Sequence, residues 1–177
     1  MAEAEGSGLA QKRLRCRGWR RGGYTSRAET SIDAGMFTAG SPSFRIKKID
    51  HVAVAVADVD AVAPLWQAAL GLGVTVREVV ASQKTEAALL PIGDSNIELI
   101  SPKGNVGLEK FLEKRGPGIH HVAVEVEGIE ALLAFLKQAG IPLIDEEPRI
   151  GARGHKVAFV HPKALGGVLV ELVEEAH

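Results

Sequence analysis

The stretch from Gly116 to Val126, Gly-Pro-Gly-Ile-His-His-Val-Ala-Val-Glu-Val, organises the chain. It predicts a turn followed by a buried strand, which a pair of histidines opens. The same pattern occurs earlier, from Ile49 to Val56, as Ile-Asp-His-Val-Ala-Val-Ala-Val. In both copies a short acidic turn and an amphipathic helical stretch follow the strand, so the chain contains two related units.

Each unit also closes on an apolar strand that carries one glutamate. Glu98 follows His51 by 47 positions, and Glu171 follows His121 by 50. If a pseudo-twofold axis relates the units, two imidazoles and two carboxylates come together. Two histidines and two carboxylates form a donor set for a divalent metal ion, so the repeat predicts a metal site shared by both units.

The length and composition are those of a globular protein. The 177 residues are 46% hydrophobic and 24% charged, which suffices for one domain with a real core or for two small modules that share one. No apolar run reaches the ~18 residues of a membrane span, so no membrane partner is expected. The single cysteine, Cys16, rules out a disulfide framework within one chain.

The net charge of −1 conceals a difference between two parts of the chain. Residues 1–48 carry ten Lys and Arg against four Asp and Glu, a net +6. Residues 49–177 carry 11 against 18, a net −7. A globular part with this negative charge is not expected to bind nucleic acid, although it is compatible with a local basic patch for an anionic ligand.

Residues 1–44 show neither helical nor strand periodicity and are rich in Gly, Ser, Arg and Ala. We predict a disordered N-terminal extension, because such a segment buries too little apolar surface to offset the entropy of ordering. Two other interpretations stay open. An organellar transit peptide is disfavoured by Glu3 and Glu5, and a basic arm for nucleic acid spans Arg13 to Arg21, with Trp19 in it. We expect a cytoplasmic protein.

Residues 45–177 predict one domain of two βαβββ modules, 45–102 and 117–175, joined by a linker helix at 108–115. The first module has a strand at 45–56, a helix at 58–70 and strands at 74–80, 86–91 and 96–100, with a hairpin turn at Gly93-Asp94. The second has a strand at 119–126, a helix at 129–139 and strands near 143–145, 156–160 and 168–173. Helical spacing gives the first helix an inward face of Val59, Val62, Leu65, Trp66 and Ala69, with Asp58 or Asp60 as N-cap.

A structural role is the simpler explanation for a single histidine that opens an apolar strand. Here His51 and His121 hold the same place in two copies, which favours a shared ligand role. A carboxylate inside a buried strand costs several kcal/mol unless it is paired or bound to metal. Glu98 and Glu171 would avoid this cost by pointing to solvent, since strand faces alternate, but their symmetric placement favours the metal site.

Three other histidines are expected to be structural. His120 precedes His121 on a strand, so alternation predicts that the two side chains face opposite ways. His155 and His161 flank a strand, where the alternatives are contact with a ligand and capping of a turn; we favour capping for both. The loop from Arg149 to Lys156 is basic in an otherwise acidic domain.

A divalent ion with two nitrogen and two oxygen ligands, and with open positions, suits the polarisation of a carbonyl oxygen. Such an ion stabilises the oxyanion that forms when a proton leaves the neighbouring α-carbon. A carboxylate ligand close to that carbon can serve as the base. The donor set therefore favours chemistry through an enolate.

Several longer motifs carry a resemblance to a known family. They are Ile-Asp-His-Val-Ala-Val at 49–54, Ile-Glu-Leu-Ile-Ser-Pro at 97–102, Phe-Leu-Glu-Lys-Arg-Gly-Pro-Gly-Ile-His-His-Val-Ala at 111–123, the run from 145 to 163, and Gly-Gly-Val-Leu-Val-Glu-Leu at 166–172. With them, residues 47–175 resemble the vicinal-oxygen-chelate (glyoxalase-like) superfamily and, within it, the methylmalonyl-CoA epimerase family.

The resemblance implies an α+β fold in which two βαβββ modules form an open, incomplete barrel. It implies that His51, Glu98, His121 and Glu171 are the metal ligands, and that the ion is Co²⁺, with other divalent ions tolerated. The implied reaction interconverts (2R)- and (2S)-methylmalonyl-CoA through an enolate, with Glu171 as one of the two acid/base groups. The implied partners are an acyl-CoA substrate and a second copy of the chain in a homodimer.

The sequence departs from the family at the second acid/base. The family usually has a Glu in a Pro-Glu-Gln-type segment, where this chain has Ser82 in Ala-Ser-Gln-Lys. A serine hydroxyl does not titrate near neutral pH. Either Glu86 or Glu78 substitutes after a local shift, or a water held by Ser82 and Gln83 does, or the reaction is different.

The substrate-binding residues that we predict are Ser82, Gln83, Lys84, Arg153 and Lys163. Lys84 would pair with a substrate carboxylate, and the loop 149–156 with Lys163 would contact the anionic CoA portion.

Two alternative functions remain. Another enzyme on the same scaffold, a glyoxalase-type lyase or an extradiol-type dioxygenase, would reuse the same positions. A protein that only binds a small ligand would be expected to lack the His and Glu set, so the presence of all four residues disfavours it.

Overall fold

The structure is a computed structural model in which residues 43–176 are described. The predictions made for residues 1–42, including the disordered extension, lie outside this range. Among the described residues, no helix has the length and apolar character needed to cross a membrane.

One eight-stranded sheet runs through the described part of the chain, in the order β2-β3-β4-β1-β5-β8-β7-β6. The first half supplies β1 (Arg45–Ala55), β2 (Val76–Val80), β3 (Thr85–Ile92) and β4 (Ser95–Pro102). The second half supplies β5 (Gly118–Glu127), β6 (Arg149–Ile150), β7 (Lys156–Val160) and β8 (Val170–Glu174). The strand order reads the same from either edge once the halves are exchanged, which is the symmetry expected of a duplicated unit.

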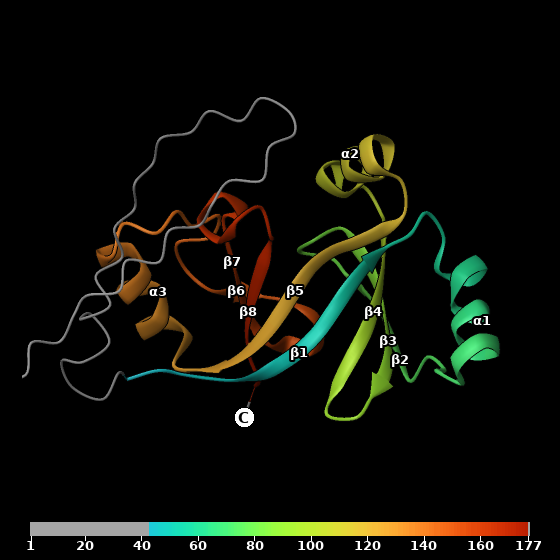
Figure 1. The fold of residues 1–177 in the computed structure, drawn as a ribbon, viewed down its shortest axis with the longest axis horizontal. Helices are drawn as coiled ribbons and strands as arrows, with labels where there is room; N and C mark the ends of the chain where they lie inside the picture. The colour runs from blue at the N-terminus through green and yellow to red at the C-terminus, as the bar shows by residue number, and fades with distance from the viewer. Residues whose placement is uncertain (1–42, 177) are drawn as a thin grey trace, which may run out of the picture. The chain divides into compact units, whose positions relative to one another are not determined.

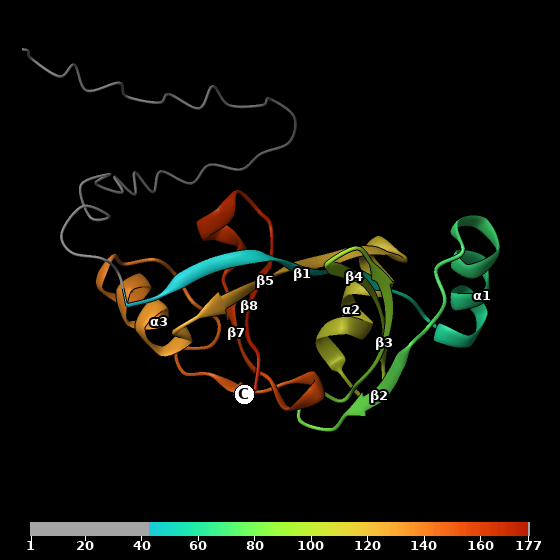
Figure 2. The same ribbon diagram turned by 90° about the horizontal axis from the view of Figure 1, so that it is seen from below.

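The two repeats meet along β1 and β5, which pair antiparallel at the centre of the sheet. β1 then pairs parallel with β4, and β5 pairs parallel with β8. The outer strands of both halves bend away to the same side of this central pair (Figures 1 and 2). The predicted α+β fold, with two βαβββ modules in an open, incomplete barrel, is confirmed.

Three helices accompany the sheet: α1 (Val59–Leu70), α2 (Val106–Arg115) and α3 (Ile129–Gln138). Asp58 caps α1, because its side chain accepts a hydrogen bond from the amide of Asp60. Asn105 caps the linker helix α2 in the same way, through the amide of Leu108. These caps satisfy amides that the first helical turn leaves without partners.

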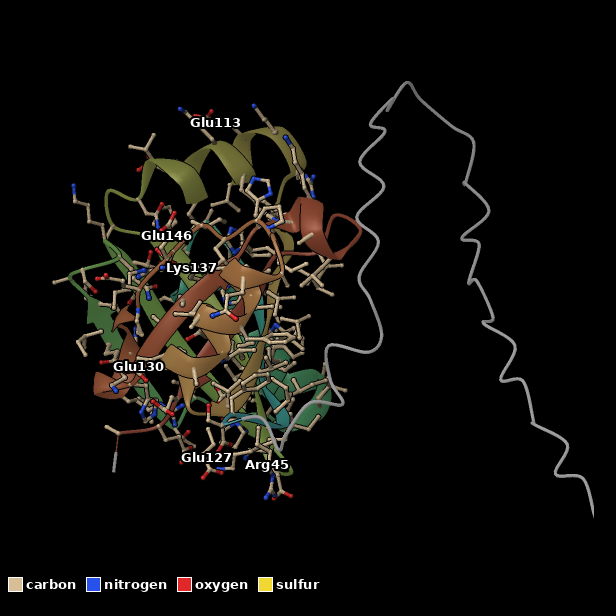
Figure 3. All side chains as sticks on the ribbon, turned by 90° about the vertical axis from the view of Figure 1, so that its left-hand side faces the viewer. Arg45, Glu113, Glu127, Glu130, Lys137 and Glu146 are labelled. Carbon is tan, nitrogen blue, oxygen red and sulfur yellow. The ribbon has the colours of Figure 1, made fainter. Side chains whose placement is uncertain are left out.

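Helices α1 and α3 cover the outer surface of their own halves. Ile129, Leu132 and Leu133 of α3 pack on a cluster of buried residues from β5, β7 and β8. The polar side of α3, with Glu130 and Lys137, is exposed (Figure 3). Packing one apolar face of a helix on the sheet leaves the inner surface of the curl free to form a site.

The first helix differs from its predicted packing. Leu65 and Ala69 were expected to face inward, but both are exposed, and the side of α1 that packs includes Ala63 instead. The sequence pattern therefore predicted the helix correctly, but the face of the helix that packs on the sheet is narrower than predicted. The predicted strand at 143–145 is also wrong: it is reduced to one isolated bridge between Leu143 and Val160.

The start of the domain lies slightly earlier than predicted. Phe44, placed in the disordered extension by the sequence pattern, packs on the second-half core with its ring 5.4 Å from that of Phe135. The carbonyl oxygen of Ser43 approaches Gly128 so closely that a Cβ there would lie 2.4 Å from it. Gly128 also has a φ of +76°, so both its backbone conformation and this contact favour glycine.

Candidate metal centre

The central strand pair sets the positions of the candidate ligands. His51 lies opposite Ala123, and His121 lies opposite Ala53. Glu98 on β4 also pairs with Ala53, and Glu171 on β8 pairs with Ala123. Each alanine is fully buried between a histidine and a glutamate. A small side chain at these two positions leaves room for four larger ones to converge above it.

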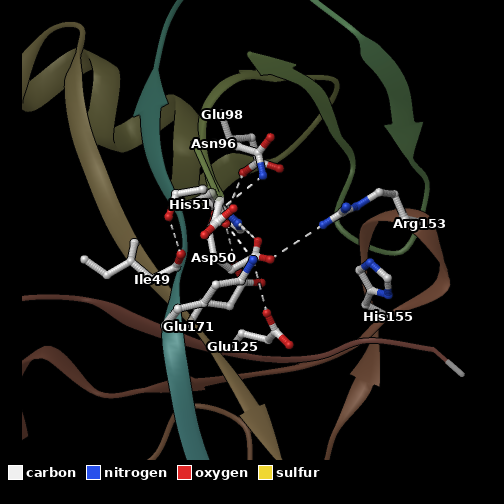
Figure 4. Close-up of polar contacts among 12 residues, drawn as sticks. Ile49, Asp50, His51, Asn96, Glu98, Glu125, Arg153, His155 and Glu171 are labelled. Atoms are coloured by element: carbon white, nitrogen blue, oxygen red, sulfur yellow. Dashed lines mark hydrogen bonds and ion pairs between the residues drawn. The ribbon is translucent and has the colours of Figure 1, made fainter. Parts of the chain in front are cut away.

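The four predicted ligands come together on the inner surface of the sheet (Figure 4 shows His51, Glu98 and Glu171). The Nε2 atoms of His51 and His121 lie 3.2 Å apart. Oε2 of Glu171 lies 3.1 Å from Nε2 of His121 and 3.3 Å from Nε2 of His51. Oε2 of Glu98 lies 3.2 Å from Nε2 of His51. The ligand atoms of His51, His121 and Glu171 all lie within 4.8 Å of one another, and Glu98 joins this group through His51.

These separations fit a bound divalent ion. Two ligand atoms that each lie ~2.1 Å from one ion, at an angle of ~100°, are ~3.2 Å apart. Two imidazole nitrogens that face each other also repel through their lone pairs unless a proton or a cation lies between them. The donor set is therefore suited to hold a first-row divalent ion in both spacing and chemistry.

The electrostatics of the cluster favour positive charge at its centre. Burial lowers the pKa of His51, but hydrogen bonds to Asp50, Glu171 and Glu98 outweigh burial and raise it to about 12. Burial raises the pKa of Glu171, but its hydrogen bonds to His121 and His51 outweigh burial and lower it to about 2. The carboxylates that stabilise an imidazolium here would equally stabilise a metal cation, which is the physical reason to place one there.

Two residues that the sequence analysis did not assign to the site also contact the histidines. Oδ1 of Asp50 lies 2.6 Å from Nδ1 of His51, and Nδ1 of His120 lies 2.9 Å from Nδ1 of His121. The prediction that His120 faces away from His121 is therefore wrong. Strict alternation fails because the register of the β1–β5 pair shifts next to each histidine.

A cavity of about 330 Å³ lies over the candidate ligands. Its walls include Ser82 and Gln83 from the first half, and Arg153 and His155 from the second. His155 was expected to be structural. Its Nδ1 accepts a hydrogen bond from the amide of Ala176, so its proton is on Nε2 when the ring is neutral. Among the described residues, that buried Nε2 has no hydrogen-bond partner, which makes His155 a donor available to the cavity.

A family model described as Glyoxalase/Bleomycin resistance protein/Dioxygenase superfamily matches residues 50–159. The chain belongs to this superfamily. The matched range contains three of the four candidate ligands, His51, Glu98 and His121. The resemblance inferred from the sequence motifs is confirmed.

Two relatives of this chain, at 34% and 38% identity, are acyl-CoA epimerases by name. The mitochondrial methylmalonyl-CoA epimerase of Mus musculus is 34% identical over 160 residues, which cover 85% of this chain and 90% of that protein. The ethylmalonyl-CoA/methylmalonyl-CoA epimerase of Cereibacter sphaeroides is 38% identical, over 72% of this chain and 97% of that protein. A structure of a single-residue variant of the methylmalonyl-CoA epimerase of Streptomyces coelicolor, in complex with 2-nitronate-propionyl-CoA, is 34% identical with a TM-score of 0.72, and covers 75% of this chain and 96% of that one.

Two of the predicted substrate-binding residues do not line the cavity. Lys84 and Lys163 are exposed and are not part of its wall. Lys84 lies on the β2–β3 turn with a φ of +49°, and its side chain runs towards Gly104 instead. Lys163 lies in a short 3₁₀ turn, Pro162–Leu165, where its amide donates to Nδ1 of His161. His161 therefore caps a turn, as expected.

Neither glutamate considered as a substitute at the Ser82 position reaches the cavity. Glu86 belongs to β3 and is buried outside the cavity, where it pairs with Arg77 and Lys103 and accepts a hydrogen bond from Ser101. The hydrogen bond from Lys103, with those from Arg77 and Ser101, lowers the pKa of Glu86 to about 2 against the effect of burial. Glu78 accepts a hydrogen bond from the amide of Arg153. Both carboxylates have other partners and neither lines the cavity, which disfavours the local shift that would use them.

Proposed function

We propose that this protein is a metal-dependent epimerase that interconverts (2R)- and (2S)-methylmalonyl-CoA. The observation that carries the proposal is the convergence of two histidines and two glutamates inside one cavity. The relatives that are named as methylmalonyl-CoA epimerases, at 34% and 38% identity, support it. No feature of the site favours a lyase or a dioxygenase over this reaction.

His51, Glu98, His121 and Glu171 would hold the ion, which we propose to be Co²⁺ on the strength of the family resemblance. When bound, the ion supplies positive charge that favours loss of the acidic hydrogen between the thioester and the carboxylate of the substrate. The buried position of the four side chains strengthens this effect, because a charge interacts more strongly where water is excluded.

Glu171 is the proposed base on one face of the substrate. Its contacts with the two histidines are made by Oε2, which leaves Oε1 to accept the α-proton. Its side chain is almost fully buried, at the floor of the cavity. A carboxylate fixed beside the reacting carbon contributes about 10²–10⁴-fold to such a proton transfer.

The return of a proton to the opposite face needs a second carrier. Ser82 and Gln83 line the cavity from the first half of the chain, whereas Glu171 comes from the second. We propose that a water held by Ser82 and Gln83 returns the proton. The hydroxyl of Ser82 donates to the carbonyl oxygen of Ile150, so its Oγ would hold the water as an acceptor. Inversion at the α-carbon requires proton carriers on opposite faces of the substrate, and two carriers from different halves of the molecule are suited to this.

The remaining parts of the proposal concern the substrate and the state of the protein. Arg149 and Arg153 line the cavity and are suited to contact the anionic acyl-CoA. We also propose that the domain extends from Phe44 to residue 177, and that the protein is a cytoplasmic homodimer. The location needs a direct test because the mouse relative is named as mitochondrial.

Hydrogen exchange tests the proposed reaction. (2S)-Methylmalonyl-CoA is incubated in D₂O with protein loaded with Co²⁺, and mass spectrometry follows deuterium at the α-carbon while chiral analysis follows the (2R) epimer. We expect the (2R) product to carry one solvent deuterium, and a chelator to stop the reaction. Exchange no faster than in buffer alone would refute the proposal.

A further inference from the structure

Both central strands carry an extra residue immediately before the candidate ligand histidine. In β1, Ile49 lies opposite Val124 and His51 lies opposite Ala123, which leaves Asp50 without a position of its own. In β5, His121 lies opposite Ala53 and Ile119 opposite Val54, which leaves His120 unmatched. Each is a β-bulge, in which two residues of one strand face one residue of its partner.

The two bulges have the same geometric consequence. In a regular strand, neighbouring side chains point to opposite faces of the sheet. Here Asp50 and His51 both line the cavity, and so do His120 and His121. The bulged residue contacts Nδ1 of the following histidine at 2.6 Å in β1 and at 2.9 Å in β5. Both copies of the repeat therefore place a partner on the same nitrogen, although the partner is a carboxylate in one and an imidazole in the other.

We propose that Asp50 and His120 are positioning residues for the metal centre, and this inference depends on the proposed metal site. An imidazole that binds an ion through Nε2 carries its proton on Nδ1. Asp50 accepts that proton's hydrogen bond from His51, and Nδ1 of His120 accepts it from His121. Each bulge thus fixes the tautomer and the ring orientation of one ligand, so that both Nε2 atoms face the same point.

The surroundings of each positioning residue support this role. Asp50 is held on its other side by Arg153, whose guanidinium nitrogen lies 3.8 Å from Oδ2 (Figure 4). His120 packs with the edge of its ring against Phe111, at 4.9 Å between centroids. To accept from His121, the His120 ring must be neutral with its proton on Nε2. The first half therefore supplies an anionic partner and the second a neutral one, which makes His51 the more electron-rich ligand.

Metal binding by variants of the full chain tests the inference. Each protein is stripped of metal and titrated with Co²⁺ against a chelator of known affinity, and the visible absorption of the bound ion is recorded. Asp50→Leu and His120→Phe keep bulk but remove the acceptor, and each is expected to weaken Co²⁺ binding about 10–100-fold and to change the absorption spectrum. Asp50→Asn is expected to fall between wild type and Asp50→Leu, because it keeps an acceptor oxygen without the charge.

His120→Asn is the decisive conservative variant. Its side-chain oxygen can stand close to the place of Nδ1, so we expect binding within about threefold of wild type and clearly tighter than for His120→Phe. Glu125→Gln is the matched control, because Glu125 is a buried carboxylate near Asp50 that pairs with Lys47 and Lys48. This variant is expected to bind Co²⁺ like the wild type.

The outcomes separate the inference from the proposed metal site. If wild-type protein binds no Co²⁺, the metal site itself fails and the inference fails with it. If wild type binds Co²⁺ and His120→Phe, checked as folded by circular dichroism, keeps its affinity and spectrum, only the positioning role is overturned. Equal losses in His120→Asn and His120→Phe would also overturn it, since an acceptor would then make no difference. Should Asp50→Leu not fold, the His120 pair decides alone.

Discussion

The two halves of the molecule share a topology but differ in how firmly each helix packs on its sheet. In the second half, Ile129, Leu132 and Leu133 of α3 are buried. In the first half, Val59 is the one buried residue of α1, and Leu65 and Leu70 are 63% and 66% exposed. The first half therefore has the weaker helix–sheet contact although both halves supply ligands to the same site.

The difference also appears in the charges around equivalent positions. Leu89 pairs with Glu98 and Phe159 pairs with Glu171, so the residues three positions earlier, Glu86 and Lys156, correspond. Glu86 pairs with basic residues, whereas Lys156 pairs with Glu130 and Glu174. The candidate ligands are the same residue types in both halves, His and Glu, whereas the residues around them differ. A shared ion would explain this pattern, because it would constrain the ligands and leave the outer packing free to differ.

The largest expected effect is the loss of exchange activity when Glu171, the proposed base, is replaced. Glu171→Gln should lower the rate of α-hydrogen exchange about 10²–10⁴-fold even with Co²⁺ bound, because the proposed base is removed. Glu98→Gln is the matched change in the other half. It should weaken Co²⁺ binding but retain most exchange activity at saturating metal, since Glu98 is a ligand and not the base.

Exchange rates at several Co²⁺ concentrations separate binding from chemistry in both variants. Equal losses at saturating metal would show that the site is symmetric in function as well as in structure, and would contradict the assignment of Glu171. Full exchange activity in Glu171→Gln would remove its role as base.

The relation between the two halves could be predicted because a repeat is visible in the amino-acid sequence. The Val-Ala-Val strands and the spacing of His and Glu led to the module order, the fold and the convergence of His51, Glu98, His121 and Glu171. The bulges at Asp50 and His120 could not be predicted, because a register shift depends on how two distant strands pair. A polar residue before both histidines, Asp in one unit and His in the other, was the available signal.

Surface contacts were the other part that sequence patterns could not decide. Lys84 and Lys163 were chosen for their charge, but the direction of a long flexible side chain depends on the turn that carries it. The exposure of Leu65 depends on how far the sheet extends beneath α1. Both the direction of these side chains and the exposure of Leu65 depend on the assembled fold. The helical period and the sign of a charge do not predict them.

The packing difference between the helices predicts unequal effects on stability. Leu133→Ala in α3 should lower the free energy of unfolding by about 3 kcal/mol, because a fully buried side chain leaves a cavity. Leu65→Ala in α1 should change it by less than about 0.5 kcal/mol, because that side chain is exposed. Urea unfolding followed by circular dichroism measures both. A loss in Leu65→Ala as large as that in Leu133→Ala would mean that α1 is covered in solution, for example by a second copy of the chain.

Ser82→Glu tests the proposed second proton carrier in the first half. A carboxylate at this wall of the cavity would replace the water, and we expect epimerisation to rise about tenfold as a positioned acid takes over the return of the proton. Ser82→Gln has a similar size without an acid, so it should not raise the rate. If Ser82→Glu is slower than Ser82→Gln at equal metal occupancy, the proton does not return from this side.

The smallest expected effect concerns Glu86 and Lys156, which have opposite charges at corresponding positions of the two halves. The effect of Glu86 on stability depends on pH. Lys103, Arg77 and Ser101 lower the pKa of Glu86 from 4.5 to about 2 in the folded protein. A lowered carboxyl pKa stabilises the fold above pH ~4.5, and this stabilisation is lost as the pH falls towards 2. Because Arg77 and Lys103 are partly exposed, we expect Glu86→Gln to lower the free energy of unfolding by only about 1 kcal/mol at pH 7.

The difference between wild type and Glu86→Gln should therefore shrink between pH 5 and pH 3 in urea unfolding measured at each pH. Lys156→Gln, at the corresponding position in the second half, should have a smaller effect at pH 7, since the Lys156 side chain is 48% exposed. A Glu86→Gln difference that stays constant down to pH 3 would mean that the basic partners do not stabilise its charge. The opposite charges of Glu86 and Lys156 would then have no effect on stability, and the ion pairs of Glu86 would not explain why this carboxylate is buried.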